Sequence, residues 1–312
     1  MGMTRMAGAI HLAFGRPTLP VAAAFVAAAG CTAPRSTLVH EVASTALAQR
    51  PPGGSGTVAE DEPDSARAPL DRLWPTIQRD LRDFPSAVWE DTKAVYAQPA
   101  NLLILGAGYG TSLTLQRTGV DRTVERHFAR HRGRTFGRDG NIGLNVAGNP
   151  AVHFAAAGLW YVAGQQTGDR KTYEVGTKLF RALTLNGLSV LLGQLLSFDA
   201  APNGEWGTLP SGHTSSTFAV AAVLDREYGP WVGVPMYGLA GMVGYARLDD
   251  DEHYLSDVVM GAVMGVVIGH TIANDNRPPE LFGGSIVPYV NPDSGSTGLA
   301  WRYPIPNGAR RR

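Results

Sequence analysis

Hydrophobic residues recur at helical spacing along most of the chain, beginning near residue 71. The first apolar positions have charged residues between them, and they are Leu73, Trp74, Ile77, Leu81 and Phe84. The same pattern continues at Val88, Val95 and Tyr96. Such spacing predicts one or two amphipathic helices that lie on a protein core or on a membrane surface.

Six longer stretches follow that contain no Asp, Glu, Lys or Arg. They span residues 99–116, 140–168, 182–198, 206–224, 228–246 and 258–274. A bilayer-spanning helix needs about 20 mainly apolar residues, and these stretches are close to that length. They are also rich in small residues, which let helices pack closely in membranes and in soluble bundles alike. We therefore predict an all-α bundle of about six core helices, either embedded in a membrane or held at one by a lipid anchor.

The regions on either side of this helical part differ in composition. Residues 32–69 are rich in Ala, Pro, Ser, Thr and Gly, which is typical of a flexible linker. In the tail, residues 276–312, the apolar residues Leu299, Trp301 and Tyr303 alternate with others, and the preceding NPDSGS favours a turn. We expect a short C-terminal β-hairpin there, and a helical domain over residues 70–275.

The first 31 residues predict a signal peptide. Arg5 is followed by a weakly apolar stretch, and the segment PVAAAFVAAAGC ends at Cys31, the single cysteine of the chain. The segment resembles a bacterial lipoprotein signal, in which the cysteine is acylated. An ordinary signal peptide with an incidental cysteine is the alternative. Both predict an exported protein of the bacterial cell envelope, and a single cysteine excludes an intrachain disulfide.

Charge excludes one class of partner and suggests another. Lys plus Arg and Asp plus Glu each number 27, so the formal net charge of zero gives no general attraction to nucleic acid. Seven arginines nevertheless fall between Arg117 and Arg138. This basic segment is either a solvated loop or helix, or a patch that faces anionic lipid headgroups or an anionic substrate.

Two short segments carry the candidate chemistry. In TLPSGHTSS, residues 208–216, a turn places His213 at the start of a predicted helix, where unpaired N–H groups suit a phosphate. In YARLDDDEHYLSDVV, residues 245–259, His253 and Asp257 are four residues apart, which on a helix brings them within reach of each other. A carboxylate on one ring nitrogen leaves the other nitrogen free. Arg247 adds a guanidinium that can hold phosphate oxygens.

Together these segments carry a family resemblance. Pro210, Ser211, Gly212 and His213, followed by Arg247, His253 and Asp257 at their spacings, resemble the second and third signature motifs of the type-2 phosphatidic acid phosphatase and vanadium haloperoxidase superfamily. The resemblance covers roughly residues 85–275. It implies an all-α fold in which the middle motif opens one helix and the third motif opens the last.

The resemblance also implies a role for each matching residue. His253 would be the nucleophile that forms a phosphohistidine, Asp257 would orient it, and His213 would protonate the leaving alcohol. The phosphoryl oxygens would be held by Arg247, Ser211 and the Gly212 amide. No metal or other cofactor is implied, and we expect the acidic run at residues 249–252 to be a solvated turn.

The first signature motif of the family is degenerate in this chain. It consists of a lysine, six further residues and an Arg-Pro pair, and alignment on Pro202 places Gln194 at the lysine and Ala201 at the arginine. Lys178 and Arg181 lie too far back on the same predicted helix to replace these cations, at about 1.5 Å of rise per residue. An arginine of the basic segment could replace them if that segment folds over the site.

These observations predict a metal-independent phosphatase with a modified phosphate cradle. Its substrate would be a phosphomonoester or a lipid (pyro)phosphate, bound from the membrane with the site facing the periplasm. A small soluble phosphoester remains possible as substrate. Two alternatives remain open: a phosphotransferase that uses the same His/His/Asp core, and a non-catalytic envelope protein that binds anionic lipid. A haloperoxidase is disfavoured, because the missing cations are those that would hold vanadate.

Overall fold

The structure is a computed structural model, and it describes residues 73–133, 135–197, 200–277, 280–281, 284–290 and 297–302. The predicted signal peptide with Cys31 and the predicted linker at 32–69 lie outside the described residues. All that follows concerns the described part of the chain.

The described residues form nine α-helices. They are α3 (Leu73–Ala97), α4 (Pro99–Thr118), α5 (Val120–His131), α6 (Gly137–Ala147), α7 (Pro150–Thr167), α8 (Arg170–Leu196), α9 (Gly212–Tyr228), α10 (Pro230–Asp249) and α11 (Leu255–Ala273). The predicted all-α architecture is therefore present. The amphipathic pattern near the start corresponds to α3, and the six uncharged stretches correspond to α4 and to α7 through α11.

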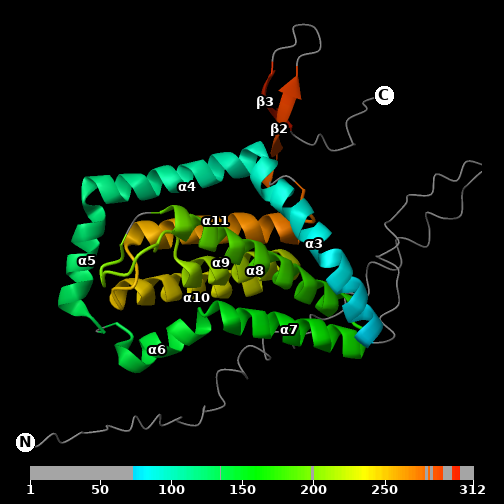
Figure 1. The fold of residues 1–312 in the computed structure, drawn as a ribbon, viewed down its shortest axis with the longest axis horizontal. Helices are drawn as coiled ribbons and strands as arrows, with labels where there is room; N and C mark the ends of the chain where they lie inside the picture. The colour runs from blue at the N-terminus through cyan, green and yellow to red at the C-terminus, as the bar shows by residue number, and fades with distance from the viewer. Residues whose placement is uncertain are drawn as a thin grey trace, which may run out of the picture. The chain divides into compact units, whose positions relative to one another are not determined.

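The helix count exceeds the prediction because the basic segment is itself helical. Residues 117–138 contain all of α5 and the start of α6, two short helices of 12 and 11 residues. In α5 the side chain of Phe128 is buried, whereas Arg122, Arg126 and Arg130 are exposed. One apolar residue in each turn directs an otherwise charged helix onto the bundle. In Figure 1 helices α4, α5, α6 and α7 follow one another around the more central α9, α10 and α11.

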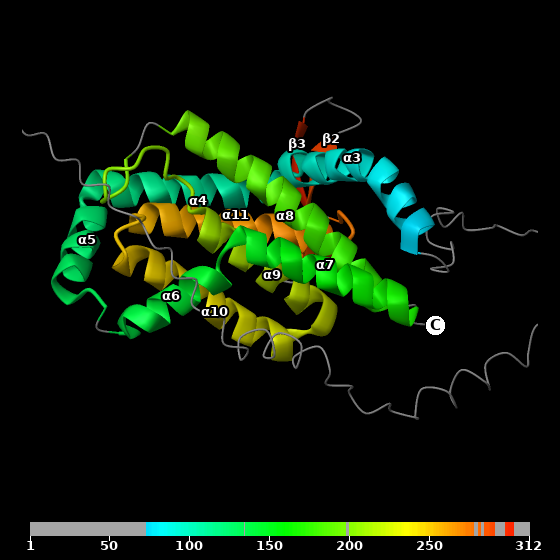
Figure 2. The ribbon, with the colours of Figure 1, turned by 60° about the horizontal axis from the view of Figure 1, so that its bottom comes forward.

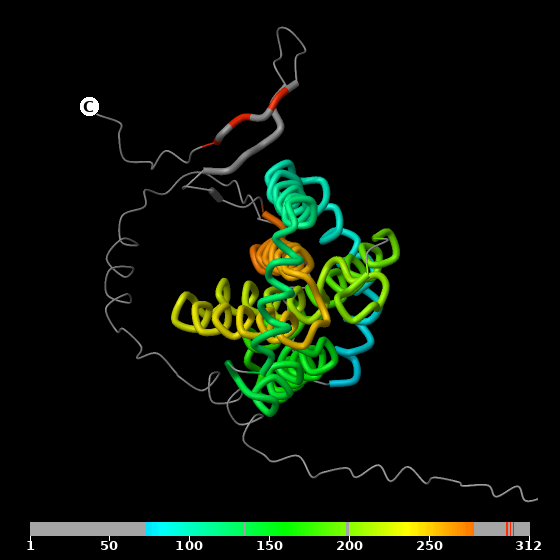
Figure 3. Tube along the Cα trace, turned by 90° about the vertical axis from the view of Figure 1, so that its left-hand side faces the viewer, coloured from blue at the N-terminus to red at the C-terminus, as the bar shows by residue number. Residues whose placement is uncertain are grey.

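The centre of the bundle is the contact between α9 and α11. Figure 3 shows α11, in orange, surrounded by the other helices, and Figure 2 shows α9 between α8 and α10. Three glycines at every fourth position of α11 face α9: Gly261, Gly265 and Gly269. A Cβ at Gly265 would lie 2.2 Å from the Ser215 carbonyl oxygen, and one at Gly269 would lie 2.4 Å from that of Ala219. Only glycine permits this approach of two helix backbones.

Ion pairs join α3 and α9 to α8, and only the Asp91 side chain among them is fully buried. The fully buried carboxylate of Asp91 on α3 accepts a 2.7 Å hydrogen bond from Nε of Arg181 on α8. Lys178, one turn earlier on α8, contacts Glu227 at 2.8 Å and Asp275 at 2.9 Å. Both cations of α8 are therefore used in holding the bundle together, because a charge removed from water needs a partner.

Three short strands follow α11. They are β1 (Glu280–Leu281), β2 (Gly284–Val290) and β3 (Thr297–Arg302), paired antiparallel in the order β1-β2-β3. The register of β2 and β3 runs from Val290 opposite Thr297 to Ser285 opposite Arg302. This pairing occurs where the sequence predicts a hairpin, whereas its turn at residues 291–296 lies outside the described residues.

Two of the described helices, α8 and α11, are long and apolar enough to cross a membrane. More than half of the apolar window of α11 is buried inside the bundle, which is equally typical of the core helix of a soluble protein. The window of α8 is one-third buried. Its last turns expose five leucines: Leu188, Leu191, Leu192, Leu195 and Leu196.

Candidate active site

His253 and Asp257 meet at the start of α11. His253 is almost buried, and its Nδ1 lies 3.3 Å from Oδ2 of Asp257, whose side chain is 1% exposed. The same carboxylate oxygen accepts the backbone N–H of Tyr254 at 3.1 Å. His253 stands just before the helix and not on it, since α11 begins at Leu255. A ring N–H donated from Nδ1 to Asp257 leaves Nε2 with its lone pair free.

The start of α9 is tied to the start of α11 through main-chain atoms. Ser211 is the N-cap of α9, is fully buried, and donates its backbone N–H to the carbonyl oxygen of Asp257 at 3.1 Å. Its hydroxyl accepts a 3.0 Å hydrogen bond from Thr214. The structure thus brings together the two segments that the sequence singles out, although their motifs lie about forty residues apart.

His213, in the first turn of α9, lies in the field of three neighbouring groups. Burial, followed by the charges of Arg247, His253 and His153, lowers its pKa to about 4. The ring of His213 is therefore neutral at pH 7 in the free protein. A cation is costly there because the site already contains a guanidinium and two other imidazoles.

Arg247, in the last turn of α10, is 7% exposed and incompletely paired. One terminal nitrogen donates to Oδ1 of Asn145 at 2.8 Å, and the other lies 3.1 Å from a carboxylate oxygen of Glu252. The third nitrogen, Nε, is buried and has no hydrogen-bond partner within the described structure. Because buried polar groups are normally hydrogen-bonded, this N–H is available for an oxygen of a ligand.

The acidic run between Arg247 and His253 differs from the expected solvated turn. Asp249 is 1% exposed and accepts the Gly133 backbone N–H at 2.9 Å and the Asn141 amide at 2.7 Å. Asp250 accepts from Asn141 and Asn145, at 2.9 and 2.6 Å. The expectation was wrong because these carboxylates hold α6 and the end of α5, which the sequence pattern did not place near them. Among the described residues, no group of three His, Cys, Asp or Glu could hold a metal ion.

The positions of the degenerate motif carry no charge. The amide of Gln194, in the last turn of α8, donates to the Pro210 carbonyl oxygen at 3.2 Å. Ala201 is 5% exposed and is fixed by a 2.7 Å backbone hydrogen bond from its N–H to the carbonyl oxygen of Glu205. Lys178 and Arg181 are paired elsewhere, as described above. The basic segment does reach this region, but its Arg132 forms an ion pair with Asp251.

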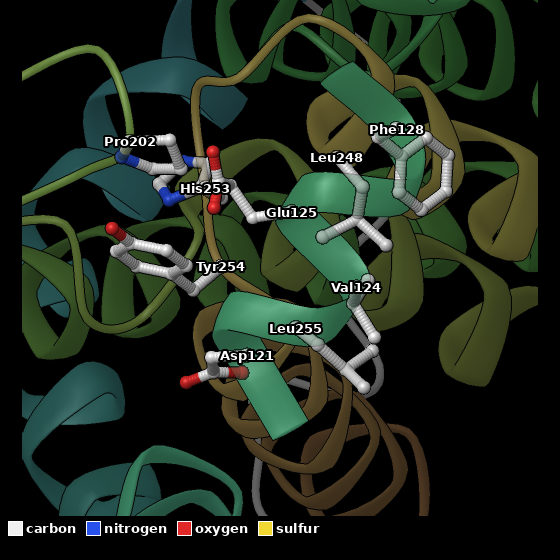
Figure 4. A pocket seen from close by; sticks show the side chains of 9 residues that line it. All are labelled: Asp121, Val124, Glu125, Phe128, Pro202, Leu248, His253, Tyr254 and Leu255. Atoms are coloured by element: carbon white, nitrogen blue, oxygen red, sulfur yellow. The ribbon is translucent and has the colours of Figure 1, made fainter. Parts of the chain in front are cut away.

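Helix α5 covers His253 and encloses a small pocket (Figure 4). The pocket is lined by Asp121, Val124, Glu125 and Phe128 of α5, and by Pro202, Leu248, His253, Tyr254 and Leu255. Figure 4 shows Glu125 and His253 among the residues that line this pocket. The sequence analysis did not single out Asp121 or Glu125. Their spacing of four residues, parallel to that of Val124 and Phe128, was the available signal for a common inward face.

Comparison with known proteins gives a family match for the helical segment that contains these residues. Residues 150–277, from α7 to the end of α11, match the model of the PAP2 superfamily. A stretch of 63 residues is 41% identical to the lipid A 1-phosphatase of Porphyromonas gingivalis, and it covers 19% of this chain and 14% of that protein. The matched part is thus about a seventh of that relative's length. No solved structure matches the chain. Both motif segments, with His213, Arg247, His253 and Asp257, lie within the stretch that is similar to the PAP2 superfamily.

Proposed function

We propose that this chain is a phosphatase that hydrolyses a lipid phosphate through a phosphohistidine on His253. The observation that carries the proposal is the almost buried His253, hydrogen-bonded to Asp257 and accompanied by the unpaired Nε of Arg247. The PAP2 match supports phosphatase chemistry, and the similarity to a lipid A 1-phosphatase supports a phosphorylated lipid as substrate.

In the proposed reaction Nε2 of His253 attacks phosphorus and the bond from phosphorus to the leaving alcohol oxygen breaks. His213, in its protonated form, gives a proton to that oxygen, so the product leaves as a neutral alcohol. A water molecule then attacks the phosphohistidine, and His213 accepts the proton of that water. Inorganic phosphate leaves and both histidines return to their first state.

The proposed phosphate cradle consists of Arg247, Ser211 and the backbone N–H of Gly212. It lacks the charges that the family places at the positions of Gln194 and Ala201. Loss of one preorganised donor to a developing anion costs about 10²–10³ in rate. We therefore propose a slower enzyme, or one whose substrate supplies part of the missing interaction.

A second candidate is a non-catalytic envelope protein that binds anionic lipid. The uncharged Gln194 and Ala201 favour it, because the cradle then lacks two charges that would stabilise a transferred phosphoryl group.

We further propose that the protein works at a membrane of the bacterial envelope, with the site on the periplasmic side. The exposed leucines in the last turns of α8 support membrane contact, since large exposed apolar surfaces usually have a partner. Export and acylation at Cys31 are proposals that rest on the N-terminal sequence alone. Mass spectrometry of the mature N-terminus tests both, with Cys31→Ser as the control.

The test is phosphate release by detergent-purified protein in the presence of a chelator. The substrates are phosphatidic acid, an isoprenyl pyrophosphate and 1-phosphorylated lipid A, beside His253→Ala and His213→Ala. Release that both variants lose supports the proposal. A folded wild-type protein that releases no phosphate from any of them contradicts it and favours the binding protein.

A further inference from the structure

Arg247 is held from the side by a residue of α6. The guanidinium donates to Oδ1 of Asn145 at 2.8 Å, across about a hundred residues of sequence. Asn145 lies before the segment that matches the family model, which begins at residue 150. None of the motif residues therefore explains how this arginine is oriented.

The amide of Asn145 is itself fixed in one orientation. Its Nδ2 donates to Oδ2 of Asp250 at 2.6 Å, while its oxygen accepts from Arg247. Exchange of the amide oxygen and nitrogen would place a donor against the guanidinium and an oxygen against a carboxylate. Asp250 therefore sets which side of the amide Arg247 meets.

A neutral acceptor has a particular advantage at this position. An amide oxygen holds a guanidinium by a hydrogen bond and leaves its positive charge for another anion, whereas a carboxylate would neutralise it. The charge matters here, because Gln194 and Ala201 stand at the two other cation positions of the cradle. The only carboxylate on the Arg247 side chain, within the described contacts, is the partly exposed Glu252 at 3.1 Å.

We propose that Asn145 is a positioning residue for phosphate binding: it orients Arg247 so that its unpaired Nε faces the phosphate, and so makes α6 part of the site. This inference rests on the proposed function. Asn145 touches the arginine and not the substrate, so its effect reaches the substrate only through Arg247.

The structure offers a matched control one helical turn earlier. Asn141 donates to Asp249 at 2.7 Å and to Asp250 at 2.9 Å, and so anchors the same acidic turn to α6. No described hydrogen bond joins it to Arg247. A purely structural role in anchoring the turn is therefore shared by Asn141 and Asn145, whereas contact with the guanidinium belongs to Asn145 alone.

The experiment compares Asn145→Ala with Asn141→Ala in the full-length, detergent-purified protein. Kinetics of phosphate release give kcat, KM and the inhibition constant of inorganic phosphate, and thermal unfolding gives the midpoint of each variant. We expect Asn145→Ala to raise KM and the inhibition constant together by about tenfold, the usual effect of losing a hydrogen bond to a charged group. We expect Asn141→Ala to lower the midpoint and to leave both constants within about twofold. Equal changes in the two variants, or none in Asn145→Ala, overturn the inference.

A double-mutant cycle tests whether Asn145 acts through Arg247. In an Arg247→Lys background the planar fork is gone, so Asn145→Ala should cause no further rise of the phosphate inhibition constant. Additive losses contradict a positioning role. Two outcomes distinguish this inference from the proposed function. A wild-type protein that releases no phosphate overturns both. An active wild type whose KM and inhibition constant do not change in Asn145→Ala overturns the inference alone.

Discussion

One carboxylate oxygen of Asp257 serves both the ring of His253, at 3.3 Å from Nδ1, and the backbone N–H of Tyr254, at 3.1 Å. The same aspartate therefore closes the first turn of α11 and orients the imidazole. The ring position is fixed by the helix itself, because any movement of Asp257 would break a helix-capping hydrogen bond.

Asp257→Asn should lower kcat by about 10² or more, because the amide neither stabilises a protonated ring nor enforces the tautomer with Nε2 free. Steady-state phosphate release measures this loss. Asp169→Asn is the control, since Asp169 caps α8 through a 3.1 Å hydrogen bond from the Lys171 backbone N–H and takes no part in the site. A similar fall of kcat in both variants would show that helix capping, and not ring orientation, is responsible.

The lowered pKa of His213 predicts an acidic preference. Burial and the charges of Arg247, His253 and His153 bring its pKa to about 4, so the protonated form that serves as general acid grows as pH falls from 7 toward 4. We expect kcat/KM to rise by up to about tenfold per pH unit over that range. A pH profile that stays flat between 5 and 7 would contradict His213 as the acid.

The leaving group provides the control for this pH dependence. The leaving group of p-nitrophenyl phosphate is a weakly basic nitrophenolate, which needs little protonation. His213→Ala should therefore lose much less activity toward it than toward an alkyl phosphate. Equal losses on both substrates would indicate that His213 binds phosphate and does not transfer a proton.

A lysine at position 194 should strengthen the weakened cradle. The side chain of Gln194 donates to the Pro210 carbonyl beside Ser211. Gln194→Lys keeps a donor at this position and adds a positive charge to it. We expect kcat/KM to rise by about tenfold, less than the 10²–10³ of a preorganised donor, because the new lysine is not held in place by designed contacts. Ala201 is 5% exposed, so an arginine there would overpack its turn.

Leu195→Lys is the matched control for this gain. It adds the same charge to the neighbouring residue, whose side chain is 69% exposed. An equal gain in the two variants would mean that general attraction of the anionic substrate is responsible. No gain in Gln194→Lys would mean that another group already fills the position of the lysine.

The contact between α9 and α11 should not tolerate a methyl group. Gly265→Ala places a Cβ 2.2 Å from the Ser215 carbonyl oxygen, and the required shift should cost about 1–3 kcal/mol in the free energy of unfolding. Gly241→Ala on α10, where nothing lies within 4 Å of the added Cβ, should instead stabilise by about 1 kcal/mol. Denaturant unfolding compares them. Equal stability of the two variants would refute the packing argument.

The sequence predicted the helices and the two motif segments because both are local patterns. Apolar spacing is visible within one helix, and His253 and Asp257 are only four residues apart. Asn141, Asn145 and the run from Asp249 to Asp251 were not predicted to meet, because hydrogen bonds between distant polar residues leave no periodic signal. From the sequence alone the acidic run is predicted to be solvated. Its hydrogen-bond donors on α6 are recognised only in the tertiary structure.

The basic segment illustrates the same limit. Seven arginines dominate its composition, whereas the side that meets the pocket is formed by Asp121, Val124, Glu125 and Phe128. Net charge describes a segment as a whole, but the site meets only one face of it. One apolar residue in each turn of α5 determines which face of the helix packs against the site.

The three glycines of α11 fix the geometry of the site through main-chain contacts. Gly261 approaches the Ser211 carbonyl, and Gly265 and Gly269 approach those of Ser215 and Ala219. The spacing between the two motif segments is therefore set by main-chain atoms of α9 and by the absence of side chains at three positions of α11. Substitutions on the outer helices can adapt the protein to a different lipid or solvent while the distance between the two histidines stays the same.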